Sequence, residues 1–300
     1  MQESILRFFQ SIATPFWDKF FTYVTMLGEQ YFVIMVVAWI YWNYSKKDGI
    51  IMMLIFLIST CLNLLLKDIF QTQRPFQKLL NLNSQRTETA IGFSFPSGHT
   101  QGATTLFTNL ALNFKKTKYL VIAILMSLLV AFSRVFLRVH WPVDVIGGFC
   151  AALIVVFVVY PFLNKMYALP KKFNKVLLII LACYYFILMI IFLLNQFVLI
   201  HPLHFKNYLS IVGIASGLIL GYLLEEKRLS FINKAKPLRM IFRFICGMIV
   251  TIGLLIGLKL LLPENELFVW FRYFITGAWI TGLYPMLGVK LKLFEKEEVG

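Results

Sequence analysis

The sequence predicts an all-α integral membrane protein, a polytopic membrane helical bundle of about nine transmembrane helices with an amphipathic helix at its N-terminus. Composition is the first reason. Hydrophobic residues make up 59% of the 300 residues and charged residues only 14%, so a water-soluble fold would expose more apolar surface than its polar side chains can cover. The second reason is that apolar stretches of about 20 residues, the length a helix needs to cross a bilayer, recur along the chain.

The first 21 residues predict an amphipathic interfacial segment that lies in the membrane plane instead of crossing the membrane. Apolar residues recur there at roughly helical spacing, namely Ile5, Phe8, Phe9, Ile12, Phe16 and Phe20. Arg7 and Lys19 lie between them, and Pro15 interrupts the pattern. Glu3 stands where a secretory signal carries positive charge, and no small-residue cleavage site follows, so we do not expect a signal peptide.

Nine later segments are apolar and long enough, or nearly so, to span a bilayer. In chain order they cover residues 22–43, 50–69, 97–114, 118–136, 142–164, 175–199, 205–224, 239–262 and 269–289. Glu29 and Gln30 interrupt the first segment, so the sequence leaves open whether it spans fully. A lysine-rich link begins at residue 165. We therefore expect a catalytic bundle at 22–164, and an additional four-helix membrane region with a cytoplasmic tail at 165–300.

Two short strings in the first half of the chain indicate anion binding. Lys67 and Arg74 are seven residues apart, so on a helix ending at Pro75 both cations would lie on one face and clasp one anion. The string Pro96-Ser97-Gly98-His99 precedes an apolar stretch. Ser97 can cap a helix there, while Gly98 lets backbone N–H groups approach a phosphate at the helix start.

A third string supplies a histidine and a carboxylate. Ser133-Arg134 is followed by His140, and Asp144 comes four residues after the histidine. Pro142 suits the first turn of a new helix, so the Asp144 carboxylate can hold one imidazole nitrogen and leave the other free to attack. Together the three strings indicate cleavage of a phosphate ester through a phosphohistidine, with no metal site and no cofactor.

In order, the strings read K-x6-RP, PSGH and SR-x5-H-x3-D. This pattern resembles the signature of the type 2 phosphatidic acid phosphatase superfamily, which also contains the vanadium haloperoxidases and the glucose-6-phosphatases. The resemblance covers about residues 50–160 and points to the integral-membrane lipid phosphatase branch. It implies that His140 is the nucleophile, that Asp144 orients it, and that His99 is the general acid.

The same resemblance implies a phosphate-binding set of Lys67, Arg74, Ser97, Gly98 and Arg134. The implied activity is that of a phosphoric monoester or diphosphate hydrolase. A site walled by apolar helices suits a membrane lipid as partner and a lipid phosphate as substrate. Candidate substrates are phosphatidic acid, phosphatidylglycerophosphate, a polyprenyl diphosphate and a sphingoid phosphate, and the sequence does not choose among them.

Basic residues predict the orientation in the membrane. If every segment crosses in turn, 17 of the 29 Lys and Arg share one side with the C-terminus, and nine lie on the side of the catalytic loops. The positive-inside rule then places the C-terminus in the cytoplasm and the active site on the extracytoplasmic side of the plasma membrane. This bias accounts for the net charge of +15, so we expect no nucleic-acid partner.

Two other functions stay open. The nine-span layout is similar to that of glucose-6-phosphatases, so a soluble sugar phosphate is a rival substrate. A non-catalytic lipid-binding or transport protein is the other alternative, since residues 176–290 add helices without an evident catalytic motif. The pairs Gly213/Gly217 and Gly253/Gly257 favour close helix packing or a homodimer.

For other polar residues we expect supporting roles. Asn63, one turn before Lys67, either steadies that lysine or bonds a neighbouring helix. Arg138 either contacts headgroups or anchors at the interface. Interfacial or solvated positions are expected for His201, His204, the turn at 225–228, and Arg243, which would snorkel at a span end.

Overall fold

The computed structural model describes residues 1–114, 116–196, 202–263 and 265–296, and the elements of these ranges are helices apart from two short strands. The predicted all-α class is therefore confirmed. The chain forms two compact units, which are described separately. Unit 1 comprises Met1–Ile34 and Ile55–Pro161, and unit 2 comprises Met35–Leu54 and Phe162–Gly300.

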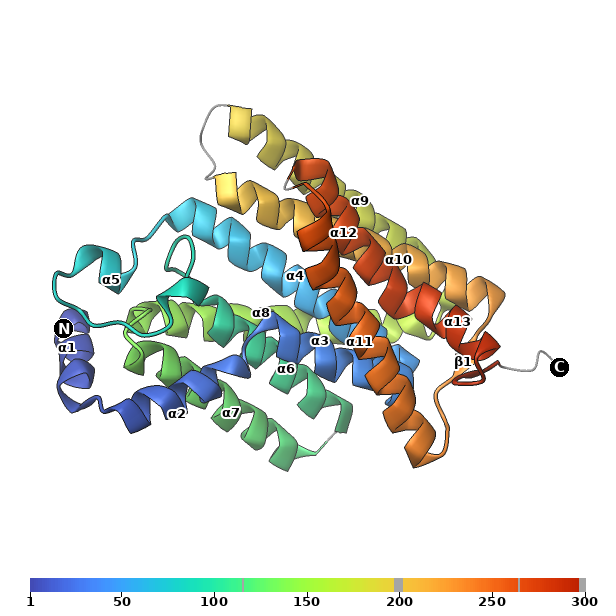
Figure 1. The fold of residues 1–300 in the computed structure, drawn as a ribbon, viewed down its shortest axis with the longest axis horizontal. Coiled ribbons are helices and arrows are strands. Elements are labelled where there is room, and N and C mark those ends of the chain that lie inside the picture. The colour runs from blue at the N-terminus through green and yellow to red at the C-terminus, as the bar shows by residue number, and fades with distance from the viewer. Residues whose placement is uncertain (115, 197–201, 264, 297–300) are drawn as a thin grey trace. The chain divides into compact units, whose positions relative to one another are not determined.

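The elements follow one another along the chain as Figure 1 shows. The first eight helices are α1 (Gln2–Ile12), α2 (Pro15–Met26), α3 (Gln30–Trp39), α4 (Lys46–Phe70), α5 (Pro75–Lys78), α6 (Gly98–Phe114), α7 (Thr117–Phe136) and α8 (Pro142–Tyr167). The others are α9 (Pro170–Gln196), α10 (Pro202–Arg228), α11 (Pro237–Leu261), α12 (Glu266–Ala278) and α13 (Tyr284–Lys290). Short π-helices follow α3 and α12, and β1 (Phe231–Ile232) pairs antiparallel with β2 (Glu295–Lys296).

Six helices in the described part of the chain are long and apolar enough to cross a membrane. They are Lys46–Lys78, Thr117–Phe136, Pro142–Tyr167, Pro170–Gln196, His204–Arg228 and Pro237–Leu261. The bent pair Pro15–Met26 and Gln30–Tyr44, which meet at 45°, can form a seventh span. The integral-membrane class is thus supported, whereas the count of nine stays a prediction.

The predicted spans at 97–114 and 269–289 are not among those six helices. Helix α6 has 17 residues, and it buries several polar side chains. Helices α12 and α13 are separated by the π-helix Trp279–Leu283. A helix that buries hydroxyl and amide groups against its neighbours has a lower hydropathy than one that faces lipid, which explains why α6 falls short.

The N-terminal segment forms two helices because Pro15 begins the second one. The Thr14 side chain caps α2 by accepting a hydrogen bond of 3.4 Å from the backbone N–H of Trp17. Helix α1 buries Leu6 in a cluster with Leu82, Ala131, Val135 and Val145, all of unit 1. Phe8 and Ile12 of the same helix are exposed. The helix therefore has one buried face and one exposed face. Its position in the membrane plane stays a prediction.

Within unit 1, helix α7 packs against both α6 and α2, as can be followed in Figure 1. The contact with α2 is aromatic: the ring centroids of Phe21 and Phe136 lie 4.4 Å apart, and those of Phe21 and Phe132 lie 5.3 Å apart. Between α4 and α6, the hydroxyls of Ser59 and Thr105 are hydrogen-bonded at 2.9 Å. These contacts hold the ends of α4, α6 and α7, which carry the three motifs, within one unit.

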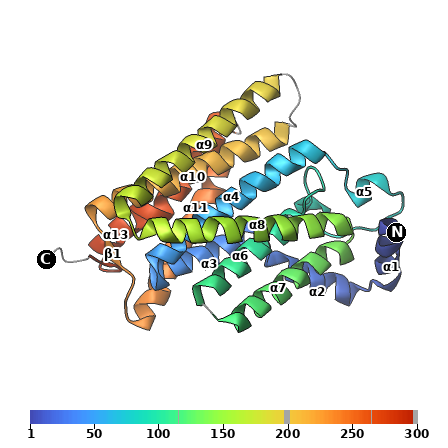
Figure 2. The same ribbon diagram turned by 180° about the vertical axis from the view of Figure 1, so that it is seen from behind.

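Within unit 2, helix α10 packs closely against α12 and also contacts α9 (Figure 2). Glycines make the approach to α12 possible. A Cβ added at Gly217 would lie 2.0 Å from the Phe274 carbonyl oxygen, and one added at Gly213 would lie 2.5 Å from that of Trp270. The predicted packing role of this pair is confirmed within the chain. At Gly253 and Gly257, by contrast, nothing lies within 4 Å of an added Cβ, so a dimer role for that pair stays a prediction.

Buried charges in unit 2 correct two predictions. Glu225 is fully buried and pairs at 2.9 Å with Lys46, so residues 225–228 are not simply a solvated turn. Arg243 is also fully buried and donates a 2.5 Å hydrogen bond to Asn43, so it does not snorkel. Each buried charge is retained because a polar partner offsets part of the desolvation cost. His204 is buried as well, and His201 lies outside the described residues.

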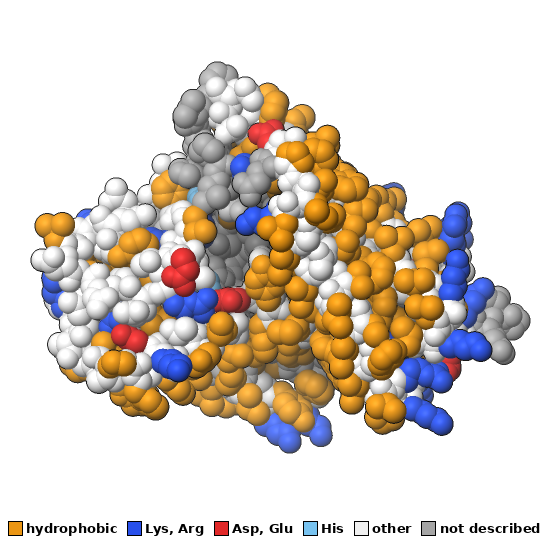
Figure 3. All heavy atoms as spheres, in the orientation of Figure 1, with side chains coloured by type: hydrophobic (Ala, Val, Ile, Leu, Met, Phe, Trp, Pro, Cys, Tyr) orange, Lys and Arg blue, Asp and Glu red, His pale blue; other side chains and the backbone are white. Residues whose placement is uncertain are grey.

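Hydrophobic side chains cover much of the face in Figure 3. In unit 2, large apolar residues on α11 are exposed, including Phe242, Ile249, Leu260 and Leu261. Exposed apolar surface on long helices is what lipid-facing segments require. This observation agrees with the membrane class that composition predicts.

Helix packing in unit 2 can be tested with matched glycine variants. Gly217→Ala places a methyl group against backbone atoms of α12, so we expect about 1–3 kcal/mol of destabilisation and a lower unfolding temperature of the detergent-solubilised protein. Gly257→Ala meets open space and replaces glycine inside a helix, so the unfolding temperature should stay the same or rise. Equal effects of the two substitutions would contradict the close α10–α12 contact.

Candidate active site

His140 lies in the short turn between α7 and α8, and α8 begins at Pro142 as predicted. Its Nδ1 atom is 3.3 Å from Oδ2 of Asp144, and both side chains are buried. The same carboxylate oxygen accepts a 2.8 Å hydrogen bond from the backbone N–H of Trp141 and another from the hydroxyl of Ser94. The predicted pairing of His140 and Asp144 is present, and Ser94 completes it.

Arg74 occupies the other side of the imidazole. Its NH1 atom is 3.1 Å from Nε2 of His140. Because a guanidinium group only donates, Nε2 must accept, and the ring proton therefore lies on Nδ1 toward Asp144. This assignment rests on the hydrogen-bond network. It leaves on Nε2 the lone pair that a nucleophile needs.

The electrostatic environment favours the neutral form of His140. Burial, followed by the positive charges of Arg74, Arg134 and Lys67, lowers the pKa of His140 well below its ordinary value. The three cations of the predicted set thus all act on this histidine. A neutral imidazole next to clustered positive charge can attack an electrophile and can share its surroundings with an anion.

Lys67 and Arg74 meet by a different route from the one predicted. Helix α4 ends at Phe70, and Arg74 precedes α5 with an extended backbone (φ −75°, ψ 155°), so the two cations do not share a helix face. The chain leaves the helix at Gln71, which has a positive φ of 45°. Both cations bind carbonyls of the loop before α6. Lys67 donates to Phe93 at 2.6 Å, and Arg74 donates to Gly92 at 2.9 Å.

The Pro96-Ser97-Gly98-His99 string is placed as predicted at the start of a helix. Helix α6 begins at Gly98, and the Ser97 hydroxyl accepts from the backbone N–H of Thr100 at 3.5 Å. The Ser97 backbone N–H in turn donates to the Asp144 carbonyl at 2.9 Å. This hydrogen bond joins the second and third strings directly.

Asn63 supports the second string and not the lysine one turn away. Its amide donates to the Pro96 carbonyl at 3.3 Å and to the Gln101 side chain at 2.8 Å. Gln101 continues the chain of hydrogen bonds to Ser59 on α4, at 3.0 Å. Of the two interpretations open for Asn63, bonding to a neighbouring helix is the one the structure supports.

Among the buried arginines that the structure describes, Arg134 has the most nitrogen atoms without a hydrogen-bond partner. It is fully buried on α7, and its NH1 atom donates to the Thr25 hydroxyl at 3.0 Å. Its Nε and NH2 atoms have no hydrogen-bond partner among the described residues. Buried donors of this kind are costly unless a ligand or water satisfies them. Arg134 is thus poised to bind an anion.

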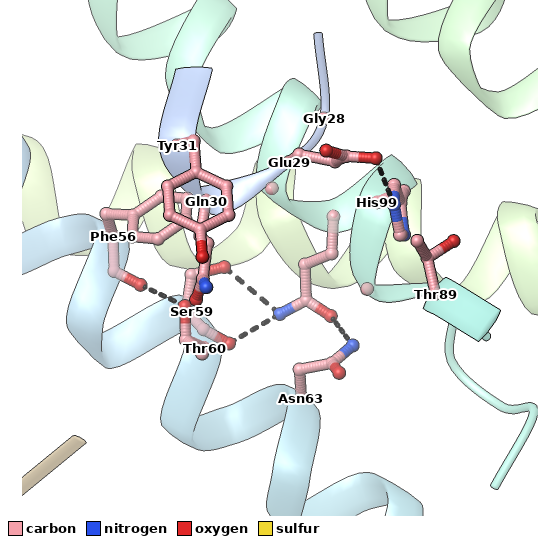
Figure 4. A pocket seen from close by; sticks show the side chains of 13 residues that line it. Gly28, Glu29, Gln30, Tyr31, Phe56, Ser59, Thr60, Asn63, Thr89 and His99 are labelled. Atoms are coloured by element: carbon pink, nitrogen blue, oxygen red, sulfur yellow. Dashed lines mark hydrogen bonds and ion pairs between the residues drawn. The ribbon is translucent and has the colours of Figure 1, made fainter. Parts of the chain in front are cut away.

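His99 lies in the first turn of α6 and lines a cavity of about 350 Å³, seen in Figure 4. Its Nε2 atom is 3.8 Å from Oε1 of Glu29, which comes from the break between α2 and α3. The wall of the cavity combines polar side chains, Ser59, Thr60 and Asn63 among them, with the aromatic rings of Tyr31 and Phe56. A hydroxylated group with an apolar continuation fits such a lining.

Some neighbours of the site carried no signal in the sequence. Ser94 contacts His140 and Glu29 faces His99, while Arg86 pairs with Glu29; their spacing to the motifs has no helical or turn meaning, so only the fold brings them there. Arg138 was expected at a headgroup or interface, yet it is buried and pairs with Asp18 of α2 at 2.9 Å. A left-handed backbone conformation (φ 62°) turns this side chain toward α2.

No group of three or more His, Cys, Asp or Glu side chains within residues 1–114, 116–196, 202–263 and 265–296 is arranged to hold a metal ion. The predicted independence of metal and cofactor stays a prediction. All eight predicted site residues lie in unit 1.

Comparisons with known proteins match both halves of the chain. Residues 48–168 match the PAP2 superfamily, and residues 209–297 match the PAP2 superfamily phosphatase, transmembrane extension. Phosphatidylglycerophosphatase B of Bacillus subtilis (strain 168) is 30% identical over 58% of this chain and 86% of its own length. An undecaprenyl-diphosphatase of Sulfolobus acidocaldarius is 31% identical over 42% of this chain and 61% of its own.

A solved structure is similar to about half of the chain. The crystal structure of the first transmembrane PAP2 type phosphatidylglycerolphosphate phosphatase from Bacillus subtilis is 30% identical. It covers 55% of this chain and 85% of its own, with a TM-score of 0.47.

Anion binding by Arg134 can be tested without any assay of turnover. We expect orthovanadate or inorganic phosphate to raise the unfolding temperature of the purified protein, because an anion bound to the folded state stabilises it. Arg134→Gln should remove most of this rise, since the amide carries no charge. Sodium chloride at matched ionic strength is the control. A rise of equal size in the variant would show that the anion binds elsewhere.

Proposed function

Because the chain belongs to the PAP2 superfamily, we propose that this integral-membrane phosphate ester hydrolase cleaves a lipid phosphate or diphosphate through a phosphohistidine at His140. One observation carries the proposal: a buried His140 is held by Asp144 at Nδ1 and by Arg74 at Nε2. The first contact fixes the tautomer, and the second brings a phosphate-binding cation to the nucleophilic atom.

The first half of the reaction transfers the phosphoryl group. The substrate phosphate binds Lys67, Arg74 and Arg134, with Arg74 passing from Nε2 of the histidine to a phosphate oxygen. The freed lone pair of Nε2 attacks phosphorus in line, and the bond from phosphorus to the ester oxygen breaks. His99 gives its proton to the departing oxygen, while Asp144 stabilises the positive charge that forms on His140.

The second half releases inorganic phosphate. A water molecule takes the place of the leaving group beside His99, which is now neutral and accepts a proton from the water. The water oxygen attacks phosphorus, the phosphorus–nitrogen bond breaks, and its electron pair returns to Nε2. The Arg134 donors and the backbone N–H groups at the start of α6 face the charge that develops in both steps. His99 is then protonated again, and Nε2 of His140 again carries its lone pair.

For the substrate we propose phosphatidylglycerophosphate first. The cavity beside His99 lies where the departing group must leave, and its hydroxyl and amide groups suit a glycerol headgroup, while Tyr31 and Phe56 suit an apolar continuation. Phosphatidylglycerophosphatase B of Bacillus subtilis is among the relatives. Phosphatidic acid, a polyprenyl diphosphate and a sphingoid phosphate are the comparison substrates, and a sugar phosphate tests the soluble alternative.

Removal of the nucleophile is the most direct test. We expect His140→Ala to reduce phosphate release to background in detergent or nanodiscs with EDTA present throughout. Asp144→Asn should lower kcat by a smaller amount, up to roughly 10⁴-fold, because the nucleophile remains but its tautomer is no longer held.

The same assay can detect the intermediate. Wild-type protein quenched in alkali during turnover of ³²P-labelled substrate should retain label, and His140→Ala should retain none. Near-normal phosphate release by His140→Ala would reject the mechanism. Activity that is lost in EDTA and restored by magnesium would reject its metal independence.

We propose that the active site faces away from the cytoplasm, on the basis of the distribution of basic residues. In a cysteine-free background, a cysteine at Asn83 should react with an impermeant thiol reagent in intact cells, and one at Lys172 should react only after lysis. Both side chains are exposed, so burial does not explain a failure to react. The reverse labelling pattern would turn the active site toward the cytoplasm.

A further inference from the structure

We propose that Glu29 is the positioning residue of His99: its carboxylate faces Nε2 of the imidazole, and the proton given to the departing group is the one on Nδ1. Neither the motifs nor the comparisons assign a role to this glutamate. The inference rests on the proposed function, because it presumes that His99 acts as the general acid.

Glu29 reaches His99 from a part of the chain outside the three motifs. It lies in the break between α2 and α3, and its Oε1 atom is 3.8 Å from Nε2 of His99. The side chains are 20% and 15% exposed, so water screens the pair only in part. Figure 4 shows the carboxylate directed at the imidazole along the edge of the cavity. A small approach during substrate binding would close this distance to a hydrogen bond.

Two contacts fix the carboxylate in this place. A Cβ added at Gly28 would lie only 2.5 Å from the carbonyl oxygen of His99, so the backbone before Glu29 packs directly on the start of α6. On the other side, NH2 of Arg86 lies 2.8 Å from Oε1 of Glu29, and NH1 of Arg86 donates to the Thr22 carbonyl at 3.4 Å. The glutamate is thus held between the histidine backbone and an arginine.

The charges around His99 explain why a carboxylate is needed. Arg134 on α7 and Arg86 in the loop before α6 both act on His99, and His140 lies within electrostatic range. Burial and the two neighbouring cations oppose a protonated imidazole, whereas an adjacent carboxylate favours it. Glu29 supplies that negative charge. The proton itself moves between His99 and the departing oxygen, and later between water and His99, so Glu29 stays ionised throughout.

This arrangement gives each histidine its own carboxylate. Asp144 acts on His140, which must be neutral to attack, and Glu29 acts on His99, which must be charged to donate. Glu29 thereby favours the protonated form of His99 that proton donation needs, against the burial and the cations that oppose it. We therefore expect that loss of Glu29 lowers kcat most for substrates whose departing group needs a proton.

The test compares Glu29→Gln with Glu88→Gln. Glu88 also pairs with Arg86, at 3.5 Å, but its side chain is 70% exposed, so it is a control with the same change of charge. The probes are dioctanoyl phosphatidic acid, whose alcohol needs a proton to leave, and p-nitrophenyl phosphate, whose phenolate does not. We expect Glu29→Gln to lower kcat about 10- to 100-fold on the lipid and clearly less on the nitrophenyl ester. KM should change little, and Glu88→Gln should match the wild type.

A second readout does not depend on turnover. The imidazole of His99, assigned by comparison with His99→Ala, can be titrated by NMR in histidine-labelled protein. We expect its midpoint to move to lower pH in Glu29→Gln and to stay in place in Glu88→Gln. If Glu29→Gln does not fold, Glu29→Asp replaces it. With the shorter carboxylate, kcat on the two probes and the His99 midpoint should change in the same directions but by smaller amounts.

The outcomes separate this inference from the proposed function. Equal losses on both probes with an unmoved His99 midpoint would overturn the role of Glu29, and so would an unaffected variant. A wild-type protein that releases phosphate neither from these probes nor from phosphatidylglycerophosphate would count against the proposed function. In that case the titration midpoint would still decide whether Glu29 stabilises the protonated form of His99.

Discussion

The main constraint on unit 1 is the burial of three cations and two histidines in a predominantly apolar bundle. Such charges are tolerated only where oxygen atoms replace water, and here the loop before α6 supplies many of these oxygens. Lys67 and Arg74 bind its carbonyls, and Ser94 of the same loop donates to Asp144. The loop therefore satisfies the cations and positions the nucleophile at once. Its conformation and the arrangement of the site depend on each other.

Helix ends carry most of the chemistry. His99 lies in the first turn of α6, Asp144 in the first turn of α8, and Arg134 in the last turn of α7. Helix starts offer backbone N–H groups to an anion, so the ends can bind phosphate where the middle of a helix cannot. The hydrogen bond from Ser97 to the Asp144 carbonyl ties two of these ends together. Arg134 keeps two nitrogen atoms without a partner among the described residues, which leaves them for a bound anion.

In unit 2, buried charges bind protein partners and stabilise the fold. Glu225 and Lys46 form a buried pair, and Arg243 bonds Asn43, so buried charges there have protein partners. Arg243 has two hydrogen bonds and one nitrogen without a partner, whereas Arg134 has one hydrogen bond and two nitrogens without a partner, which leaves Arg134 the better placed to bind an anion. Glycines allow α10 and α12 to approach backbone to backbone, which is how helices associate where burial of apolar surface gives little driving force.

The sequence by itself predicted the all-α membrane class, six of the nine expected spans, the helix starts at Gly98 and Pro142, and the pairing of His140 with Asp144, because these depend on composition and on residues a few positions apart. The prediction that Lys67 and Arg74 share a helix face was wrong, because the helix ends at Phe70. The predicted surroundings of Arg138, Glu225 and Arg243 were also wrong, because the partners of these residues are distant in sequence. The contacts of Ser94 with Asp144 and of Glu29 with His99 could not be predicted for the same reason. Only tertiary packing brings such groups together, since local periodicity holds no information about which loop a buried charge will meet.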